Sequence, residues 1–391
     1  MKIGIYSPFY PQLTALSRYA YDFVRFSKKY GLDANLIPTN RQVAQYNGVG
    51  VATPSDVSLI VYSWGNNPLH HTMLHAFCKR TITGKSGLSV MHDPLMPFLA
   101  NRNCPACRTL RPLLFLSQAP RIVKTRIKLA KWKLQWLEPY IFLKSCSTVV
   151  TSEYARSVFT ELNLDLTEHK IHTVRYPVDF EEYGHVQKEH ARKLLRIPDD
   201  KIVFLCPGVI SPHKGIEDTL YAIRVLKEMY RINNLIYILL GEDPAPHIYE
   251  RSLVSCISSW RLTGHVKRVP FVSNEPGNNM FRLYLAASDF VFVPRRHTFG
   301  ETSAVIPEAM AAGKVVIGAN LGSTPEYLRD RGLLVPPGDP ISIADGVLRL
   351  LDSDRERRSL ERRAKRFAET ELDWKVIIRK LAPILEAAHA P

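Results

Sequence analysis

The stretch IVFLCPGVISPHKG, residues 202–215, joins a short apolar run to a glycine-containing loop, and helix-forming sequence follows over 216–231. The same alternation of apolar runs and amphipathic segments continues to residue 337. Strands that alternate with helices of about 10–15 residues are typical of βαβ units and a parallel sheet. The pattern therefore predicts a doubly wound α/β domain, with strands at 202–206, 235–241, 265–269, 289–294, 314–319 and 332–337.

The first half of the chain carries a similar pattern. Residues 16–30 predict a helix, and the neighbouring Val/Ile/Leu-rich runs are typical of strands covered on both faces. A polar stretch over 174–201 then separates the two halves. We expect two Rossmann-like doubly wound domains, residues 1–182 and 190–372, that face an interdomain cleft, and a C-terminal helix over 373–391. The strands predicted in the first half are 2–6, 58–64, 87–93 and 147–152.

Composition narrows the class of protein. The chain has 391 residues, of which 46% are hydrophobic and 23% charged, which excludes a disordered or collagen-like protein. That length is more than one ordinary core holds and suits two domains. No apolar run approaches the roughly 18 residues of a membrane-spanning helix, and the N-terminus lacks the features of a signal peptide. With six scattered cysteines, the sequence indicates a soluble cytoplasmic protein.

The loop after the 202–206 strand has the features of a phosphate site. Gly208 lets the backbone turn closely, Lys214 supplies a positive charge, and Gly215 precedes the next helix. Phosphate sites combine a lysine with a glycine-permissive loop in this way, although the P-loop spacing is absent. The plain alternative is an ordinary turn with an exposed lysine.

A second motif follows the strand at 289–294, in the stretch PRRHTFGETSAVIPEAMAAGKVVI, residues 294–317. Thr302 or Ser303 is predicted to cap the next helix, whose first N–H groups would then face an anion. Glu308 lies further along that helix, where a carboxylate accepts hydrogen bonds from a ribose diol. In the plain alternative, Glu301 and Glu308 are solvated charges of a helix.

Together these motifs resemble a known family. Residues 204–351 are similar to the C-terminal half of the retaining nucleotide-sugar glycosyltransferases of family 4, which have the GT-B fold. The resemblance rests on Gly208 with Lys214-Gly215, EAMAAGKVVI at 308–317, Gly322, Glu326 and GLLVPPGDP at 332–340. The N-terminal half is similar more loosely, at His92-Asp93, TSEY 151–154, YPVD 176–179 and Trp374, where family members return the chain to the first domain.

The resemblance implies a role for each matched residue. Lys214 would hold the diphosphate of a UDP or GDP sugar, with Gly208 and Gly215 shaping its loop, and Glu308 would hold the ribose. The residues expected to approach the sugar and phosphate are Gly300, Glu301, Thr302 and Ser303. His92, from the opposite domain, would orient the transferred sugar, so His92 and Glu301 are the candidate catalytic residues. No strand-flanking DxD motif of the metal-dependent transferases is present, and the resemblance implies neither a metal nor another cofactor.

Two departures from the family pattern bear on activity. Val209 stands where many members carry an arginine, and Arg295 or Arg296 is a candidate replacement. The earlier glutamate of the family's pair falls at Gly300, whereas Glu301 lies one position later, about 100° around a helix. These departures keep a catalytically weak nucleotide-sugar-binding relative open as an alternative. A sugar phosphorylase or nucleotide-sugar epimerase on the same fold is the other.

Positive charge concentrates in one part of the first half. The formal net charge is +15, and residues 101–150 contain ten Lys/Arg and one acid, Glu138. Within them, residues 120–140 form a Lys-rich amphipathic segment with tryptophan, which favours an anionic membrane surface or an anionic acceptor. We therefore expect a glycan, lipid-linked or small-molecule acceptor, and peripheral membrane association. No nucleic-acid module is matched. The alternative is a domain helix with a solvated basic face.

The pair Cys104 and Cys107 forms a CxxC motif. Such a motif supplies half of a zinc site or a redox pair, but a structural zinc site needs four ligands. The nearby His71 and His75 precede the cysteines instead of following them at zinc-finger spacing. We interpret the motif as a plain loop and predict no metal site.

Overall fold

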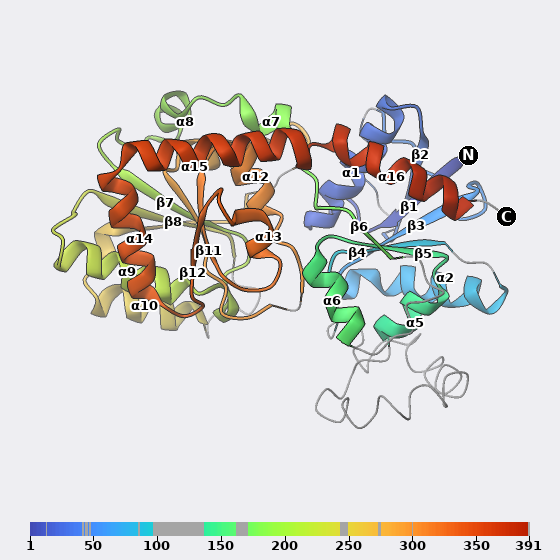
Figure 1. The fold of residues 1–391 in the computed structure, drawn as a ribbon, viewed down its shortest axis with the longest axis horizontal. Coiled ribbons are helices and arrows are strands. Elements are labelled where there is room, and N and C mark those ends of the chain that lie inside the picture. The colour runs from blue at the N-terminus through green and yellow to red at the C-terminus, as the bar shows by residue number, and fades with distance from the viewer. Residues whose placement is uncertain are drawn as a thin grey trace, which may run out of the picture. The chain divides into compact units, whose positions relative to one another are not determined.

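The computed structural model describes residues 1–389 except 13, 41–42, 44–45, 47, 85–86, 97–136, 162–170, 243–248, 273–274 and 299. Cys104, Cys107 and residues 120–136 of the basic segment therefore lie outside the described residues. The chain forms two compact units, each built on one six-stranded sheet with helices against it (Figure 1). The first comprises Met1–Tyr176, Phe299–Thr302 and Trp374–Pro391, and the second comprises Pro177–Thr298 and Ser303–Asp373.

The sheet of the first unit is parallel throughout, with strand order β2-β1-β3-β4-β5-β6. Its strands are β1 (Lys2–Ser7), β2 (Asp33–Pro38), β3 (Leu59–Trp64), β4 (Leu88–Met91), β5 (Ser147–Val150) and β6 (Ile171–Thr173). The described helices of this unit are α1 (Ala15–Lys29), α2 (His71–Ile82), α5 (Leu137–Lys144), α6 (Glu153–Glu161) and α16 (Trp374–His389), and Pro68–His70 form a 3-10 turn.

The four strands predicted in this half are confirmed, but β2 and β6 were not predicted. β2 begins with the exposed Asp33 and has a half-buried Asn35, so it lacks a continuous apolar run. β6 has three half-buried residues and lies at the edge of the sheet. Edge strands of this kind have little of the apolar character that reveals a buried parallel strand in a sequence.

Helices α1 and α16 pack on each other through aromatic side chains. The Trp374 ring is buried, with its centroid 5.1 Å from that of Tyr19 and 5.9 Å from that of Phe26. Thr14 caps α1, accepting a hydrogen bond from the Ser17 amide at 3.1 Å. The last helix of the chain is thus part of the first unit.

The second unit has a parallel sheet with strand order β12-β11-β10-β7-β8-β9. Its strands are β7 (Ile202–Pro207), β8 (Leu235–Leu240), β9 (Val266–Val269), β10 (Phe290–Val293), β11 (Val315–Ala319) and β12 (Leu333–Val335), all of which were predicted. The described α-helices are α7 (Phe180–Gly184), α8 (Lys188–Leu195), α9 (Ile216–Glu228), α10 (Tyr249–Ser259), α11 (Met280–Ala287), α12 (Val305–Ala311), α13 (Thr324–Leu328), α14 (Pro340–Asp352) and α15 (Asp354–Phe367). Pro212–Lys214 and Thr263–His265 form 3-10 turns, and Ala368–Leu372 form a π-helical turn.

The order of this second sheet reverses between β7 and β10. β8 and β9 follow β7 on one side, whereas β11 and β12 follow β10 on the other. In open α/β sheets, ligands bind outside the carboxyl ends of the strands at such a reversal. The loops that leave β7 and β10 therefore occupy the position expected of a binding site.

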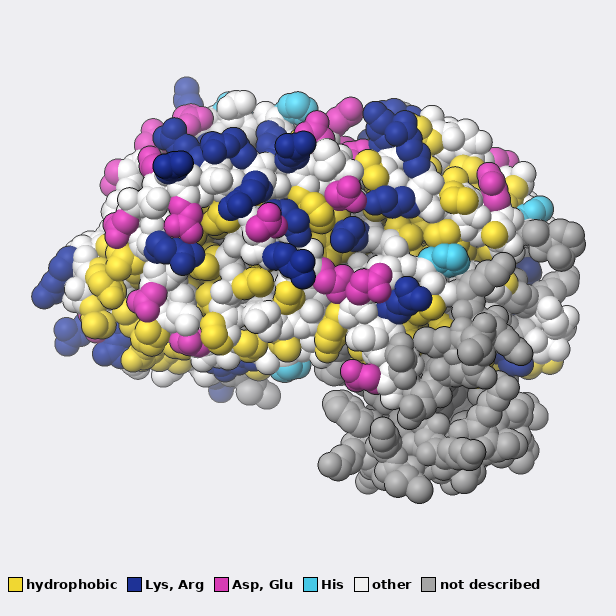
Figure 2. Space-filling model, viewed as in Figure 1, with side chains coloured by type: hydrophobic (Ala, Val, Ile, Leu, Met, Phe, Trp, Pro, Cys, Tyr) yellow, Lys and Arg dark blue, Asp and Glu magenta, His cyan; other side chains and the backbone are white. Residues whose placement is uncertain are grey.

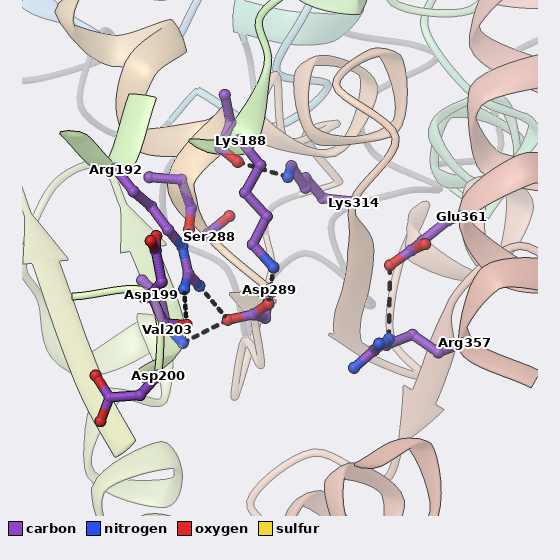
Figure 3. Close-up of polar contacts among 12 residues, drawn as sticks. Lys188, Arg192, Asp199, Asp200, Val203, Ser288, Asp289, Lys314, Arg357 and Glu361 are labelled. Atoms are coloured by element: carbon purple, nitrogen blue, oxygen red, sulfur yellow. Dashed lines mark hydrogen bonds and ion pairs between the residues drawn. The ribbon is translucent and has the colours of Figure 1, made fainter. Parts of the chain in front are cut away.

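A buried ion-pair network joins the amino ends of β7 and β10 (Figure 3). The Asp289 carboxylate accepts hydrogen bonds from the Val203 amide at 2.7 Å and from Arg192 at 2.8 Å, and Lys188 pairs with its other oxygen. Burial lowers the pKa of the neighbouring Lys314 to about 8. The network lies at the opposite end of the strands from the loops, so it fixes the spacing of β7 and β10 without occupying the candidate site.

Among the described residues, no helix combines the length and the apolar character that crossing a membrane requires.

Candidate functional site

The loop after β7 is held close to the end of β8. The Gly208 amide donates to the Leu240 carbonyl at 2.9 Å, and Gly208 has a φ of 107°, which favours glycine. A Cβ at Gly241 would lie 2.0 Å from the Gly208 carbonyl oxygen, so no side chain fits there. Two glycines thus let the backbone of the loop lie against the strand ends, where an anion would bind.

The other end of the same loop is held against β10. Lys214 ends the 3-10 turn, and Gly215 follows with a φ of 65°. A Cβ at Gly215 would lie 2.0 Å from the Pro294 carbonyl oxygen, which follows β10. The sequence prediction of a tight glycine loop is consistent with this geometry. The contact also brings Lys214 to the point where the sheet order reverses.

Two cations, the half-buried Lys214 and the buried Arg295, act on each other at this point. Burial is the largest cause that lowers the pKa of Lys214, to about 7, and the positive charge of Arg295 lowers it further, while the Cys206 thiol acts in the opposite direction. The Arg295 side chain is 8% exposed. None of the groups that shift the pKa of Lys214 is a carboxylate. An edge of low dielectric constant that carries two positive charges is suited to an anionic ligand, because the negative charge of the ligand would offset both of them.

The adjacent Arg296 has a different environment. Its guanidinium donates two hydrogen bonds to Asp218, at 2.6 and 2.8 Å. Its amide donates to the His213 carbonyl at 2.9 Å, which joins the end of β10 to the lysine loop. Of the two arginines considered as replacements at Val209, Arg295 acts electrostatically on Lys214, and Arg296 is hydrogen-bonded to Asp218.

Glu308 lies in α12 of the same unit and is largely buried. Its Oε1 accepts a hydrogen bond from the Tyr183 hydroxyl at 3.0 Å. Tyr183 is not predictable from the sequence as the partner of Glu308, since it precedes Glu308 by 125 positions and belongs to no motif.

The predicted cap of this helix is wrong. α12 begins after Ala304, and neither Thr302 nor Ser303 supplies a capping side chain. The hydroxyls of Thr302 and Thr151 lie 3.0 Å apart and are hydrogen-bonded, so Thr302 is engaged elsewhere. Ser303 contributes only its carbonyl, which accepts from the Ile306 amide.

The predicted site residues of this loop divide between the two units. Gly300, Glu301 and Thr302 belong to the first unit, and Ser303 belongs to the second. Gly300 has a φ of 93°, and a Cβ there would lie 2.3 Å from a ring carbon of Pro94. This position therefore requires glycine for two reasons, its backbone conformation and its neighbour.

His92 follows β4 at the carboxyl edge of the first sheet. Its amide donates to the Trp64 carbonyl at 3.0 Å, its Nε2 lies 3.1 Å from the Ser63 hydroxyl, and its ring centroid is 4.4 Å from that of Tyr19. Burial, with a smaller effect of His70, lowers the pKa of His92 to about 3. The imidazole is therefore neutral at physiological pH. Among the described residues, no group is hydrogen-bonded to its Nδ1.

The surroundings of His92 were not predicted from the sequence. Ser63 lies in β3, which neighbours β4 in the sheet. His70 is also buried, and burial lowers its pKa to about 3. The sequence does contain one signal for these neighbours of His92, namely polar residues in and after the strand β3. The carboxyl ends of parallel strands meet at one edge of a sheet, so such residues are expected to lie near the residue that follows β4.

Comparison with known proteins shows which class of protein this chain resembles. Residues 187–367 match the family described as Glycosyl transferases group 1. The chain is 29% identical over 205 residues to the D-inositol 3-phosphate glycosyltransferase of Corynebacterium glutamicum, covering 52% of this chain and 47% of that protein. It is 25% identical over 278 residues to the alpha-D-kanosaminyltransferase of Streptomyces kanamyceticus, covering 68% of this chain and 67% of that protein. The chain spans about half the length of the first of these relatives.

The fold is that of a solved structure over nearly the whole chain. HepE from Anabaena, in complex with UDP, has a TM-score of 0.71 at 16% identity and covers 99% of this chain and 100% of its own. The protein therefore has the GT-B fold of glycosyltransferases, as predicted. The match to the family of group 1 glycosyl transferases spans residues 187–367, which contain the lysine loop and Glu308.

Proposed function

We propose that this protein transfers a sugar from a nucleoside-diphosphate sugar to an acceptor, with retention at the anomeric carbon. The observation that carries the proposal is the pair of the half-buried Lys214 and the buried Arg295, which lie where the strand order reverses between β7 and β10. A diphosphate carries negative charge, which is opposite to the charge of Lys214 and Arg295. The solved structure of HepE, which shares the fold, contains UDP. The match of residues 187–367 to the group 1 glycosyl transferases supports the same reaction class.

In this proposal, the two cations stabilise the departing diphosphate. Negative charge increases on the leaving oxygen as the bond to the sugar breaks, and fixed cations in a low-dielectric site stabilise that charge more than water does. Lys214 binds a phosphate oxygen as a point charge, and Arg295 binds through its planar guanidinium. The close approach of Gly215 to Pro294 keeps the two cations near each other before the donor binds.

Glu308 is proposed to hold the ribose. A carboxylate accepts hydrogen bonds from two adjacent hydroxyls, as in other nucleotide sites. The hydrogen bond from Tyr183 fixes the orientation of this carboxylate. Gly208, Gly215 and Ser303 shape the surrounding backbone in this proposal.

His92 is proposed to orient the transferred sugar as a neutral imidazole. Its low pKa leaves it uncharged between pH 5 and 8, so it serves as a hydrogen-bonding group and not as a proton store. The Ser63 hydroxyl is hydrogen-bonded to Nε2 of His92, so the other ring nitrogen, Nδ1, is proposed to bind a sugar hydroxyl. Gly300, Glu301 and Thr302 are proposed to complete this side of the site.

The first unit is proposed to bind the acceptor, and the second the donor. The basic residues within 101–150 favour an anionic or lipid-linked acceptor. The Corynebacterium relative is named for a phosphorylated acceptor, inositol phosphate, which supports the same charge preference. Peripheral association with the cytoplasmic face of a membrane through residues 120–140 is part of this proposal.

The proposal is tested by incubating the protein with a panel of UDP and GDP sugars and measuring release of the nucleoside diphosphate. Release should occur with at least one donor, be lost in Lys214→Ala, and persist in Lys227→Ala. Lys227 is the matched control because its ammonium donates to the Arg261 carbonyl on the exposed side of α9. Cleavage that depends on added phosphate would instead indicate a sugar phosphorylase.

A donor-binding protein without turnover is the second candidate. It is favoured by Val209, 49% exposed where many family members have arginine, and by the position of Glu301. Binding of UDP in a thermal shift assay, without diphosphate release from any donor of the panel, would support this second function.

A further inference from the structure

Helix α15 carries a stripe of arginines along its outer face. The stripe consists of four exposed side chains, those of Arg355, Arg358, Arg362 and Arg366. They follow one another at intervals of three or four residues, which places them on one face of the helix. The buried residues of the helix, Leu360 and Ala364, lie on the opposite face. In Figure 2, dark blue Lys and Arg side chains gather along the position of α15 in Figure 1. We call these four residues the arginine stripe.

Most of the arginine stripe has no acidic partner. In the part of the chain that the structure describes, Arg355, Arg362 and Arg366 take part in no ion pair. Arg358 pairs with Asp354 at 3.4 Å, but both side chains are at least 60% exposed, so this pair contributes little stability. The stripe therefore presents unneutralised charge to solvent, and this charge does not stabilise the helix.

We propose that the arginine stripe binds an anionic lipid surface. Arg355 and Arg366 are eleven positions apart, so the stripe extends about 17 Å along the helix. A straight row of guanidiniums on the convex side of a helix fits a flat array of phosphates, whereas a single small anion needs a concave site. The apolar face of α15 packs into its own unit, through Leu360 and Ala364, so the helix contributes charge without inserting into the bilayer.

A nucleic acid fits this surface less well. A helix that reads a groove must protrude into it, but α15 is embedded on its apolar side. Single-stranded binders add exposed aromatic rings on which bases stack, and the only aromatic residue of α15 is Phe367, which is packed against the core. The lipid surface is therefore the occupant that the charge pattern favours.

This inference stands on α15 alone. It does not depend on the donor site, and it concerns different residues from the basic segment 120–140. Either proposal can fail without the other, because vesicle binding and diphosphate release are measured separately.

The experiment is vesicle flotation of the full chain, with vesicles of phosphatidylcholine alone or with 30% phosphatidylglycerol. The test variant is Arg355→Gln/Arg362→Gln/Arg366→Gln. The matched control removes three exposed charges of the same unit, Arg231→Gln/Arg251→Gln/Lys267→Gln. A third variant, Lys124→Gln/Lys128→Gln/Lys131→Gln, tests the basic segment. Thermal unfolding of each variant verifies that it folds.

We expect the wild type to float with the anionic vesicles at low salt and not with the neutral ones. Since each basic residue near an anionic surface changes partitioning about fivefold, the α15 variant should bind about 100-fold more weakly. The control should stay within about threefold of the wild type. The inference is overturned if wild-type protein does not float, or if the α15 variant binds like the control. It is overturned equally if the α15 variant keeps vesicle binding but loses binding to inorganic polyphosphate, which would identify a soluble anion as the ligand.

Discussion

The carboxyl edges of the two sheets differ in chemistry although both sheets are six-stranded and parallel. The edge of the second unit holds two cations, the half-buried Lys214 and the buried Arg295, whereas the edge of the first holds two buried histidines, His70 and His92. Burial lowers the pKa in both places, but with different results. The histidines become neutral well below physiological pH, while Lys214, with a pKa of about 7, remains partly charged.

This difference teaches how the two sheets would divide two tasks in the proposed function. The neutral edge would orient a sugar through hydrogen bonds without attracting competing anions. The charged edge would select the diphosphate and stabilise it as it leaves. The four predictions below test whether the division holds.

The largest effect is expected at Lys214. Replacement by alanine removes a buried charge-assisted contact, and such contacts contribute about 1.5–3 kcal/mol, so UDP should bind about 100-fold more weakly. Isothermal titration calorimetry at pH 6.5 measures this, with Lys227→Ala as the control. Unchanged affinity in Lys214→Ala would remove the charged edge from the donor site.

The pH dependence of donor binding should reveal the positive charge of Lys214. The pKa of Lys214 is lowered to about 7 in the free protein, and the protonated ammonium is the binding form. The affinity for UDP should therefore be highest below pH 7 and fall about tenfold per pH unit above it, until the pKa of the complex is reached. Calorimetry in buffers of different ionisation enthalpy should also detect proton uptake at pH 8. A flat profile between pH 6.5 and 8.5 would contradict this account.

Arg295→Ala should weaken UDP binding about 20-fold, because one of the two cations is lost. Adding Val209→Arg to that variant should recover much of the affinity, since Val209 is half-exposed and the family pattern has arginine there. Arg296→Ala is the control. It should lower the thermal stability through loss of the Asp218 pair and change the affinity little. Equal losses in the two arginine variants would contradict the distinction between them.

The smallest effect concerns the neutral edge. Ser63→Ala removes the partner of His92 Nε2, so the sugar should be less well oriented and the transfer rate about fivefold lower, with unchanged UDP affinity. Ser58→Ala, at an exposed position before β3, serves as the control. A loss of UDP affinity in Ser63→Ala would show that the two edges do not divide their tasks.

Much of the fold could be predicted because burial on both faces leaves continuous apolar runs, as in Ile202–Pro207. The short β6 and the partly polar β2 leave no such signal. The lysine loop was also predictable, because its glycines and lysine are close in sequence. Such local signals depend only on neighbouring residues.

The remainder of the site depends on contacts between distant residues. Arg295 and Arg296 are adjacent in sequence, yet one is buried beside Lys214 and the other pairs with Asp218. The partner of Glu308, Tyr183, and the partner of His92, Ser63, are set by the tertiary fold. The hydroxyl of Thr302 fits a capping pattern, but it is hydrogen-bonded to Thr151.

The tight approach of Gly215 to Pro294 has an energetic consequence. Because backbone atoms set this contact, the two cations are brought together when the chain folds, and the repulsion between them is present before any donor arrives. This repulsion makes the folded protein less stable than its packing alone would make it. Occupation of the edge relieves the repulsion, so nucleotide should raise the melting temperature more at low ionic strength than at high.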